Sequence, residues 1–140
     1  MGIWHATLKA FSAIYTGSNV AADPRKSIGS RWWLDAAPNG TAYPYAVYKV
    51  VDATQDAFFN AKDAEDIDID VVIVTGPTST QCADLADAFA VLFHKASLTF
   101  GVGDNLTAAP VRRAGPAVGP FTDPDGVWQM TVPFAVRTSK

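Results

Sequence analysis

Apolar residues recur in two stretches of the chain with the spacing of an α-helix. In 3–15 they fall at i, i+4, i+7 and i+11, and in 82–93 they fall at i, i+3, i+4, i+7, i+10 and i+11. This spacing gathers apolar side chains on one side of a helix. We therefore expect two amphipathic helices, and Thr78 with Gln81 three residues later predicts a capping box at the start of the second.

Three other stretches have the pattern of β-strands. Aromatic and β-branched residues predict a strand over 43–51. A second strand is predicted over 66–75, where apolar and polar residues alternate in the first half and both faces are apolar from Val72 onward, and a third over 128–137, where the alternation recurs. Alternate side chains of a strand point to opposite faces of the sheet. The second strand is therefore expected to place three aspartates on one face: Asp66, Asp68 and Asp70.

These elements predict an α+β fold in a single domain, 1–140. Shorter strands are possible at 31–34 and around 109–114, and 23–41 reads as a long turn-rich insertion. The economical arrangement is an antiparallel or mixed sheet of about four strands, with both helices packed on one face. Pro133 lacks an N–H donor, which predicts a sheet edge or a bulge at that position.

Composition and charge argue against nucleic-acid binding, membrane contact and a zinc site. Eleven Lys and Arg residues against fourteen Asp and Glu residues give a net charge of −3, unlike the basic surface of a nucleic-acid-binding protein. No apolar run approaches the roughly 18 residues that a membrane-spanning helix needs, so we expect no membrane contact. One cysteine and two histidines are too few for an ordinary zinc site.

The aspartate series 66, 68, 70 has the initial spacing of a calcium loop, but the rest of that motif is missing. Such a loop requires Gly at its sixth position and Glu at its twelfth, where this chain has Val71 and Pro77. The simpler reading is three solvated carboxylates, and a third reading is an acidic wall facing a lumen if the chain forms a ring. We expect no metal and no cofactor.

Cys82 and His94 are the strongest candidates for a nucleophile and its base. Twelve residues along one helix separate them by about 18 Å, so they cannot meet within one subunit. Cys82 is expected in the core, and His94 at the C-terminal end of the helix. The sequence does not predict an enzyme.

Aromatic and arginine residues favour protein contacts instead, because these types dominate interface energetics. The candidate interface residues are Trp32, Trp33, Phe58, Phe59, Arg112 and Arg113. Each also has an ordinary reading: one Trp caps the core, one Phe points inward, and the Arg pair is solvated.

Two short segments carry a resemblance to a known family. The strand Pro44–Tyr48 reads Pro-Tyr-Ala-Val-Tyr, and the helix Ala83–Phe89 reads Ala-Asp-Leu-Ala-Asp-Ala-Phe. Together with an N-terminal helix, a polar hairpin and a final strand after an Arg-bearing segment, this order resembles the tail terminator or tail completion proteins of long-tailed bacteriophages. The resemblance covers nearly the whole chain.

The resemblance implies a structural virion protein that forms a ring, usually of six subunits, on the head-proximal end of the tail tube. Its partners would be further copies of itself, the tail tube protein and the head–tail connector or neck proteins, after assembly in the cytoplasm of the bacterial host. DNA would pass through the lumen without specific binding, along a wall lined by Asp66, Asp68 and Asp70. A head-side connector protein and, in another class, a small-molecule-binding or carboxylate enzyme with a site between Trp32–Trp33 and the aspartates remain as alternatives.

Overall fold

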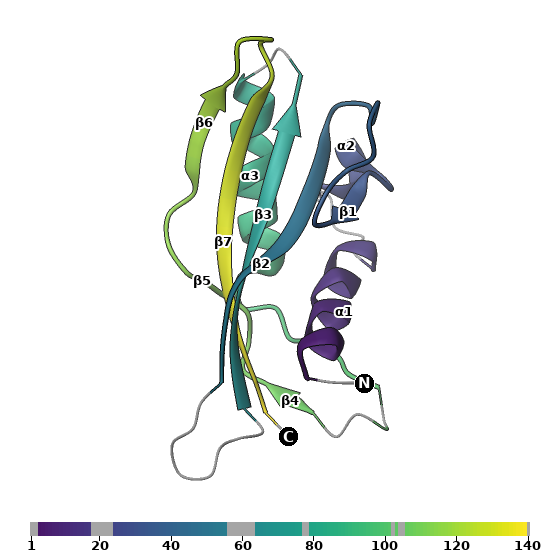
Figure 1. Ribbon diagram of the computed structural model, residues 1–140, viewed down its shortest axis with the longest axis vertical. Coiled ribbons are helices and arrows are strands. Elements are labelled where there is room, and N and C mark those ends of the chain that lie inside the picture. The colour runs from purple at the N-terminus through teal and green to yellow at the C-terminus, as the bar shows by residue number, and fades with distance from the viewer. Residues whose placement is uncertain are drawn as a thin grey trace.

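A mixed β-sheet with helices packed against it forms the centre of the molecule (Figure 1). The structure is a computed structural model that describes residues 3–17, 24–55, 64–76, 79–101, 103 and 106–139. The described helices are α1 (Ile3–Thr16), α2 (Arg25–Ile28) and α3 (Ser79–Phe93). The described strands are β1 (Trp32–Leu34), β2 (Tyr45–Gln55), β3 (Ala64–Thr75), β4 (Thr107–Ala108), β5 (Arg112–Arg113), β6 (Val118–Thr122) and β7 (Trp128–Ser139).

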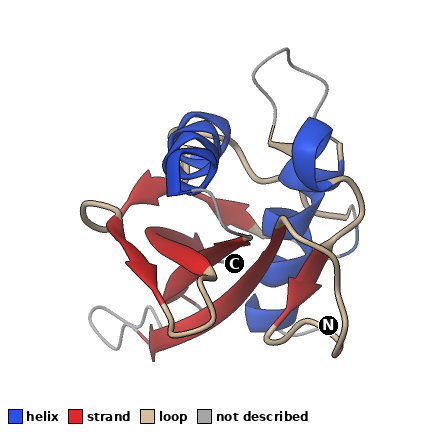
Figure 2. Cartoon of the chain, turned by 90° about the horizontal axis from the view of Figure 1, so that it is seen from above, coloured by secondary structure: helices blue, strands red, loops and turns tan. Residues whose placement is uncertain are grey.

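Three long antiparallel strands, β2, β3 and β7, form the centre of the sheet, and β1 pairs with β2 in parallel. The far edge of β7 pairs in turn with β4, β5 and β6. The expectation of about four strands was wrong, because the described residues form seven. The Gly- and Pro-rich stretch before β7 supplies the additional short strands, and these satisfy backbone groups of β7 that would otherwise lack partners. The expected α+β class is confirmed, and the sheet is mixed. Figure 2 shows its strong curvature.

Pro133 lies in β7, which is an interior strand, so of the two predicted positions, a sheet edge or a bulge, the sheet edge was wrong. Its carbonyl accepts a hydrogen bond from Ala114 N–H at 3.0 Å, so its nitrogen faces the same side of the strand. That side is where the partner of β7 changes from β5 to β6. The missing donor therefore falls at a gap in the ladder, which is why a proline is tolerated inside the sheet.

The two predicted helices are confirmed, and both pack on one face of the sheet. Leu8, Phe11 and Tyr15 of α1 are buried, as the spacing predicts. They join one core with the α3 residues of the apolar repeat and with alternate residues of β3 and β7. The rings of Phe11 and Phe93 stack at 4.3 Å between centroids, which joins α1 to α3. The Thr78 half of the predicted capping box lies outside the described residues.

The turn-rich insertion contains two elements that the sequence only partly predicts. β1 occupies the possible strand around 31–34, whereas the short helix α2 was not expected. Arg31 fixes this segment, because its Nε donates to the carbonyl of Pro44 at 2.8 Å and its guanidinium also donates to the carbonyl of Ser27 at 3.0 Å. The segment therefore places β1 firmly beside the start of β2.

Candidate functional site

The face of the sheet turned away from α1 and α3, here called the second face, carries a column of aspartates along β3. The predicted alternation is confirmed: Ile67, Ile69 and Val71 are fully buried on the helix side, whereas the three aspartates are half-buried on the other side. Strand geometry alone imposes this division, since successive side chains point to opposite faces.

Cations flank the aspartate column on both sides. In register, Lys49 lies opposite Asp70 on β2, and Arg137 lies opposite Asp66 on β7. The Arg137 guanidinium and the Asp66 carboxylate approach to 3.4 Å, with both side chains more than 40% exposed. These three aspartates are therefore not an isolated wall of negative charge.

A third cation lies one strand further out. Asp68 pairs in register with Ala135, and Ala135 pairs with Arg112 on β5. Because paired residues of neighbouring strands share a face, Arg112 and Asp68 lie on the second face with the small Ala135 side chain between them. Three carboxylates and three cations thus alternate across this end of the face.

Among the three aspartates of the column, Asp70 has a carboxyl pKa that its environment raises. Burial raises the pKa of its carboxyl, Lys49 opposes that shift, and Asp68 adds to it. Asp70 lies where the column meets the apolar end of β3, so its carboxylate is less well hydrated.

The other end of the second face is apolar. Val47 of β2 and Val74 of β3 are buried there, and Trp33 of β1 pairs in register with Val47. The Trp33 ring is half-buried, and its buried indole N–H finds no acceptor within the described part of the chain. The second face therefore combines a charged end and an apolar end.

Trp32, a predicted interface residue, lies in the core. Its ring stacks on Tyr15 at 4.4 Å and on Tyr48 at 4.6 Å, and its indole N–H donates to Ser12 Oγ at 2.9 Å. Of the pair Trp32 and Trp33, only Trp32 follows the ordinary reading, in which one tryptophan ring caps the core. Since Trp32 points to the helix side, it cannot form a site with the aspartates on the second face.

The remaining predicted contact residues are placed as follows. Arg112 and Arg113 are both exposed on β5, where strand alternation turns them to opposite faces. Phe58 and Phe59 lie outside the described residues, in the connection between β2 and β3. Among the described candidates, Trp32, Trp33, Arg112 and Arg113 therefore do not form one continuous patch.

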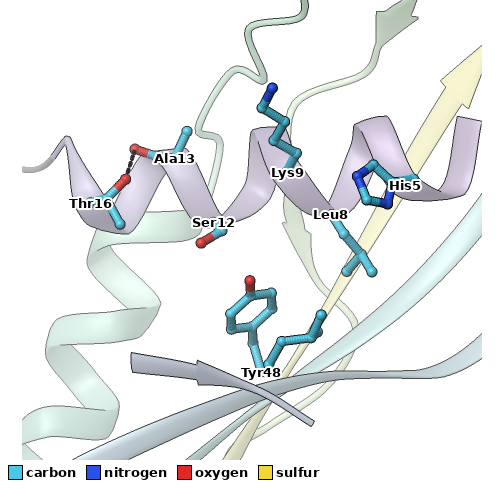
Figure 3. A pocket seen from close by; sticks show the side chains of 8 residues that line it. His5, Leu8, Lys9, Ser12, Ala13, Thr16 and Tyr48 are labelled. Atoms are coloured by element: carbon cyan, nitrogen blue, oxygen red, sulfur yellow. Dashed lines mark hydrogen bonds between the residues drawn. The ribbon is translucent and has the colours of Figure 1, made fainter. Parts of the chain in front are cut away.

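A groove between α1 and the β1–β2 edge is a feature that sequence reasoning missed (Figure 3). It has a volume of about 410 Å³ and is lined by His5, Leu8, Lys9, Ser12, Ala13, Thr16, Leu34 and Tyr48. Figure 3 shows Leu8 and Ser12 pointing from the helix toward Tyr48, with Lys9 at the rim pointing away from it. The signal was present in the sequence: the polar positions 5, 9, 12 and 16 repeat the helical spacing of the apolar stripe, one residue later.

The predicted separation of Cys82 from His94 is confirmed by their environments. Cys82 is buried, burial raises the pKa of its thiol, and the thiol lies 3.8 Å from the carbonyl of Ile73. His94 is exposed just beyond the end of α3. A thiol of raised pKa without a basic neighbour is not an activated nucleophile.

Within the residues that the structure describes, no three His, Cys, Asp or Glu side chains form a group suited to holding a metal ion. None of the helices in these ranges is long and apolar enough to span a membrane.

The fold places the chain among α+β proteins in which two helices cover one face of a mixed sheet. No protein-family model and no curated protein matches the sequence. Among solved structures, the chain is similar to a chain of the virion of a native gene transfer agent (GTA) particle, with a TM-score of 0.68 and 15% sequence identity. The match covers 93% of this chain and 94% of that chain, so the two share a fold over nearly their whole length.

Proposed function

We propose that this chain is a structural protein of a phage-like virion. The observation that carries the proposal is the shared fold with a chain of a gene transfer agent virion, which extends over 93% of this chain. The order of elements that resembles tail terminator proteins supports the same class independently, because it rests on the residues of this chain.

Within that class, we propose that the protein caps the head-proximal end of a tail tube as a ring of identical subunits, with six as the expected number. A closed ring requires two different surfaces on each subunit that fit each other after a fixed rotation. The sheet offers unlike edges, since β1 is a short parallel strand at one edge and β6 is an exposed antiparallel strand at the other. The ring would end tube polymerisation and provide the surface for head joining.

The partners in this role are neighbouring subunits, the tail tube protein and the connector or neck proteins, and the location is the head–tail interface of the virion. The DNA would pass through the lumen without specific binding. The alternation of acidic and basic side chains at one end of the second face supports weak contact with phosphates, because neighbouring charges of opposite sign cancel much of the field.

The mass of the native particle tests the ring. Light scattering or direct imaging of the purified protein should give a closed particle of several subunits, and a particle that keeps the mass of one chain under all assembly conditions would contradict the proposal.

The location of the subunit tests the terminator role. We expect the protein on isolated headless tails. Its presence on tailless heads instead would assign it to the head-side connector class.

A further inference from the structure

The two outer strands β1 and β6 lie at the same level of the sheet, on opposite sides of the long strands (Figure 1). In register, one row of paired residues crosses the whole sheet at this level. It runs through Trp33, Val47, Val72, Thr131 and Val118. Trp33 on β1 and Val118 on β6 are therefore the two ends of a single row.

Both ends of this row carry apolar surface on the second face. Paired residues of neighbouring strands share a face, so Val118 lies on the same face as Trp33. Val118 and Phe121 of β6 are 49% and 57% exposed, although apolar side chains gain free energy when they are removed from water. At the other end, the buried indole N–H of Trp33 has no acceptor in the described part of the chain.

The outer strands also direct backbone groups away from the sheet. The Arg31 carbonyl and the Asp35 N–H bond to β2, so the backbone groups of Trp32 point away from β2. The Asp123 N–H bonds to the chain just before β7, so the backbone groups of Thr122 point away from β7. In the described ranges, the backbone groups of Trp32 and Thr122 find no partner. Such groups are a template for pairing with another strand.

The two sides of the sheet have opposite charges at a matching level. On one side, the exposed Arg113 pairs in register with Phe134 of β7. On the other side, the exposed Asp35 follows Leu34, whose row ends at Val132. Asp35 and Arg113 thus differ by one residue in level, or about 3.3 Å along the strands. Neither forms an ion pair with another described residue.

Strand direction determines how the two sides would meet in a ring. β1 is parallel to β2 and therefore to β7, whereas β6 is antiparallel to β7. Rotation about an axis that runs along the long strands preserves both the direction and the level of each strand. Under this rotation, β6 of one subunit meets β1 of the next in antiparallel orientation, with Val118 opposite Trp33.

We propose that the outer side of β6 docks against the outer side of β1 of a second copy of this chain, so that Val118 and Phe121 cover Trp33 and Arg113 faces Asp35. This inference rests on the proposed ring, because it assigns the two unlike surfaces that such a ring needs. Pro120 has no N–H to donate, so the backbone pairing is short. Apolar packing and the charge pair supply the rest of the contact.

Substitution of the exposed β6 residues tests the apolar part of the contact. Val118→Glu and Phe121→Ala should each weaken self-association at least about tenfold by light scattering, as expected for residues at the centre of an interface. Val91→Glu is the matched control, because Val91 is 74% exposed on α3 and should assemble as the wild type does. Circular dichroism and thermal melting establish that each variant is folded.

Charge reversal tests the polar part of the contact. Asp35→Lys and Arg113→Glu should each weaken self-association, because each places like charges across the interface. The chain carrying both substitutions should recover most of the loss, since opposite charges then face each other again. Lysine is compatible with the backbone at position 35, because Lys95 has a φ of 65° where Asp35 has 66°. Additive losses in the double variant would contradict the charge pair.

Disulfide formation tests the register. Within one chain, Trp33 and Val118 are separated by four strand spacings, or about 19 Å along the sheet, whereas a disulfide needs Cα atoms within about 7 Å. Chains carrying Trp33→Cys and differently tagged chains carrying Val118→Cys are mixed under oxidising conditions, while the buried Cys82 stays unreactive. A disulfide-linked product with both tags supports the inference, and replacing Val118→Cys with Val91→Cys should abolish it.

The outcomes separate this inference from the proposed function. If particles of several subunits form, yet Val118→Glu assembles normally and no product with both tags appears, the contact between β6 and β1 is overturned and the ring stands. A disulfide that forms only within doubly substituted single chains would also overturn the contact between copies. A wild-type protein that never exceeds the mass of one chain would overturn both.

Discussion

Trp32 and Trp33 show how neighbouring residues acquire different roles. Trp32 faces the helices and stacks between aromatic rings, whereas Trp33 pairs beside Val47 on the second face and keeps a buried N–H without an acceptor in the described part of the chain. A buried donor without a partner costs free energy in the isolated subunit. At this scale, the direction of a side chain decides its role more than its chemical type does.

Asp70 gives a prediction at the scale of one titrating group. Because burial raises the pKa of Asp70, the native state holds the proton more tightly than the unfolded chain does. This carboxyl therefore favours folding at pH values below its unfolded pKa, and that contribution is lost as the pH rises through the raised native value. An NMR titration of the Asp70 carboxyl carbon should show a midpoint above the ordinary value of about 3.9.

The Lys49→Met variant provides the control for that titration. Lys49 lowers the pKa of Asp70, so its removal should shift the midpoint further upward. A midpoint at the ordinary aspartate value in the wild type, or one that falls in Lys49→Met, would contradict the assignment of burial and Lys49 as the causes.

Elements are joined across the core by a few specific polar contacts as well as by apolar packing. Thr7 of α1 and Thr138 of β7 are both fully buried, and their hydroxyl groups form a hydrogen bond at 3.0 Å. This contact links residues 131 positions apart. It fixes the first turns of α1 against the last residues of the chain.

Substitutions of the two threonines should change the free energy of unfolding in a strongly non-additive way. Thr7→Val should cost about 1–3 kcal/mol, because it leaves the Thr138 hydroxyl buried without its partner. The double variant Thr7→Val with Thr138→Val should be nearly as stable as the wild type, since both polar groups are then replaced by methyl groups of similar shape. Urea unfolding of Thr7→Val, Thr138→Val and the double variant measures these free energies, and additive losses would show that the hydrogen bond is not the relevant interaction.

The edge strand β6 depends on one glycine. Gly119 has a φ of 118°, and a Cβ added there would lie 2.9 Å from the carbonyl oxygen of Gln129 on β7. Gly119→Ala should therefore destabilise the protein by about 1–3 kcal/mol and weaken the β6–β7 pairing. Gly103→Ala is the matched control, because nothing lies within 4 Å of its added Cβ.

Hydrogen exchange measures the effect of Gly119→Ala element by element. Amides of β6 should lose protection, while those of the β2–β3 pair should keep it, because local opening is confined to the contacts that are lost. Equal loss across the sheet, or no loss in β6, would contradict this assignment.

At the scale of the whole molecule, the sheet has one face closed by helices and a second face divided into a charged and an apolar end. The charged end balances Asp66, Asp68 and Asp70 with Lys49, Arg112 and Arg137. Neutralising the acids alone would leave three cations on this face, and cations attract nucleic-acid phosphates.

If the charged end lines the lumen of the proposed ring, replacing all three aspartates by asparagine should leave the particle mass unchanged and reduce genome delivery. The reason is that DNA phosphates would then bind to the wall instead of sliding past it. Delivery assays of virions carrying the triple variant measure the effect, with Asp87→Asn on the outer surface of α3 as the control. Unchanged delivery, or an assembled structure with these residues on the outer wall, would exclude the lumenal role.

Much of the fold could be predicted because its signals are local. The helical spacing of Leu8, Phe11 and Tyr15 and the alternation of aspartates with Ile67 and Ile69 determine which side of each element is buried. The short strands β4 to β6 could not be predicted in the same way. Their few residues carry no periodic signal, and they become strands because the edge of β7 offers partners for their backbone groups.

The sequence by itself determined the element types, the buried side of each long element and the single face of the aspartates, since these follow from repeats of 3.6 and 2 residues along the chain. Only the tertiary structure decided that Lys49, Arg112 and Arg137 flank those aspartates, that Trp32 and Trp33 separate, and that a groove opens beside α1. The physical reason is that these relations depend on strand register and helix docking, which join residues far apart in the chain through packing of the whole core.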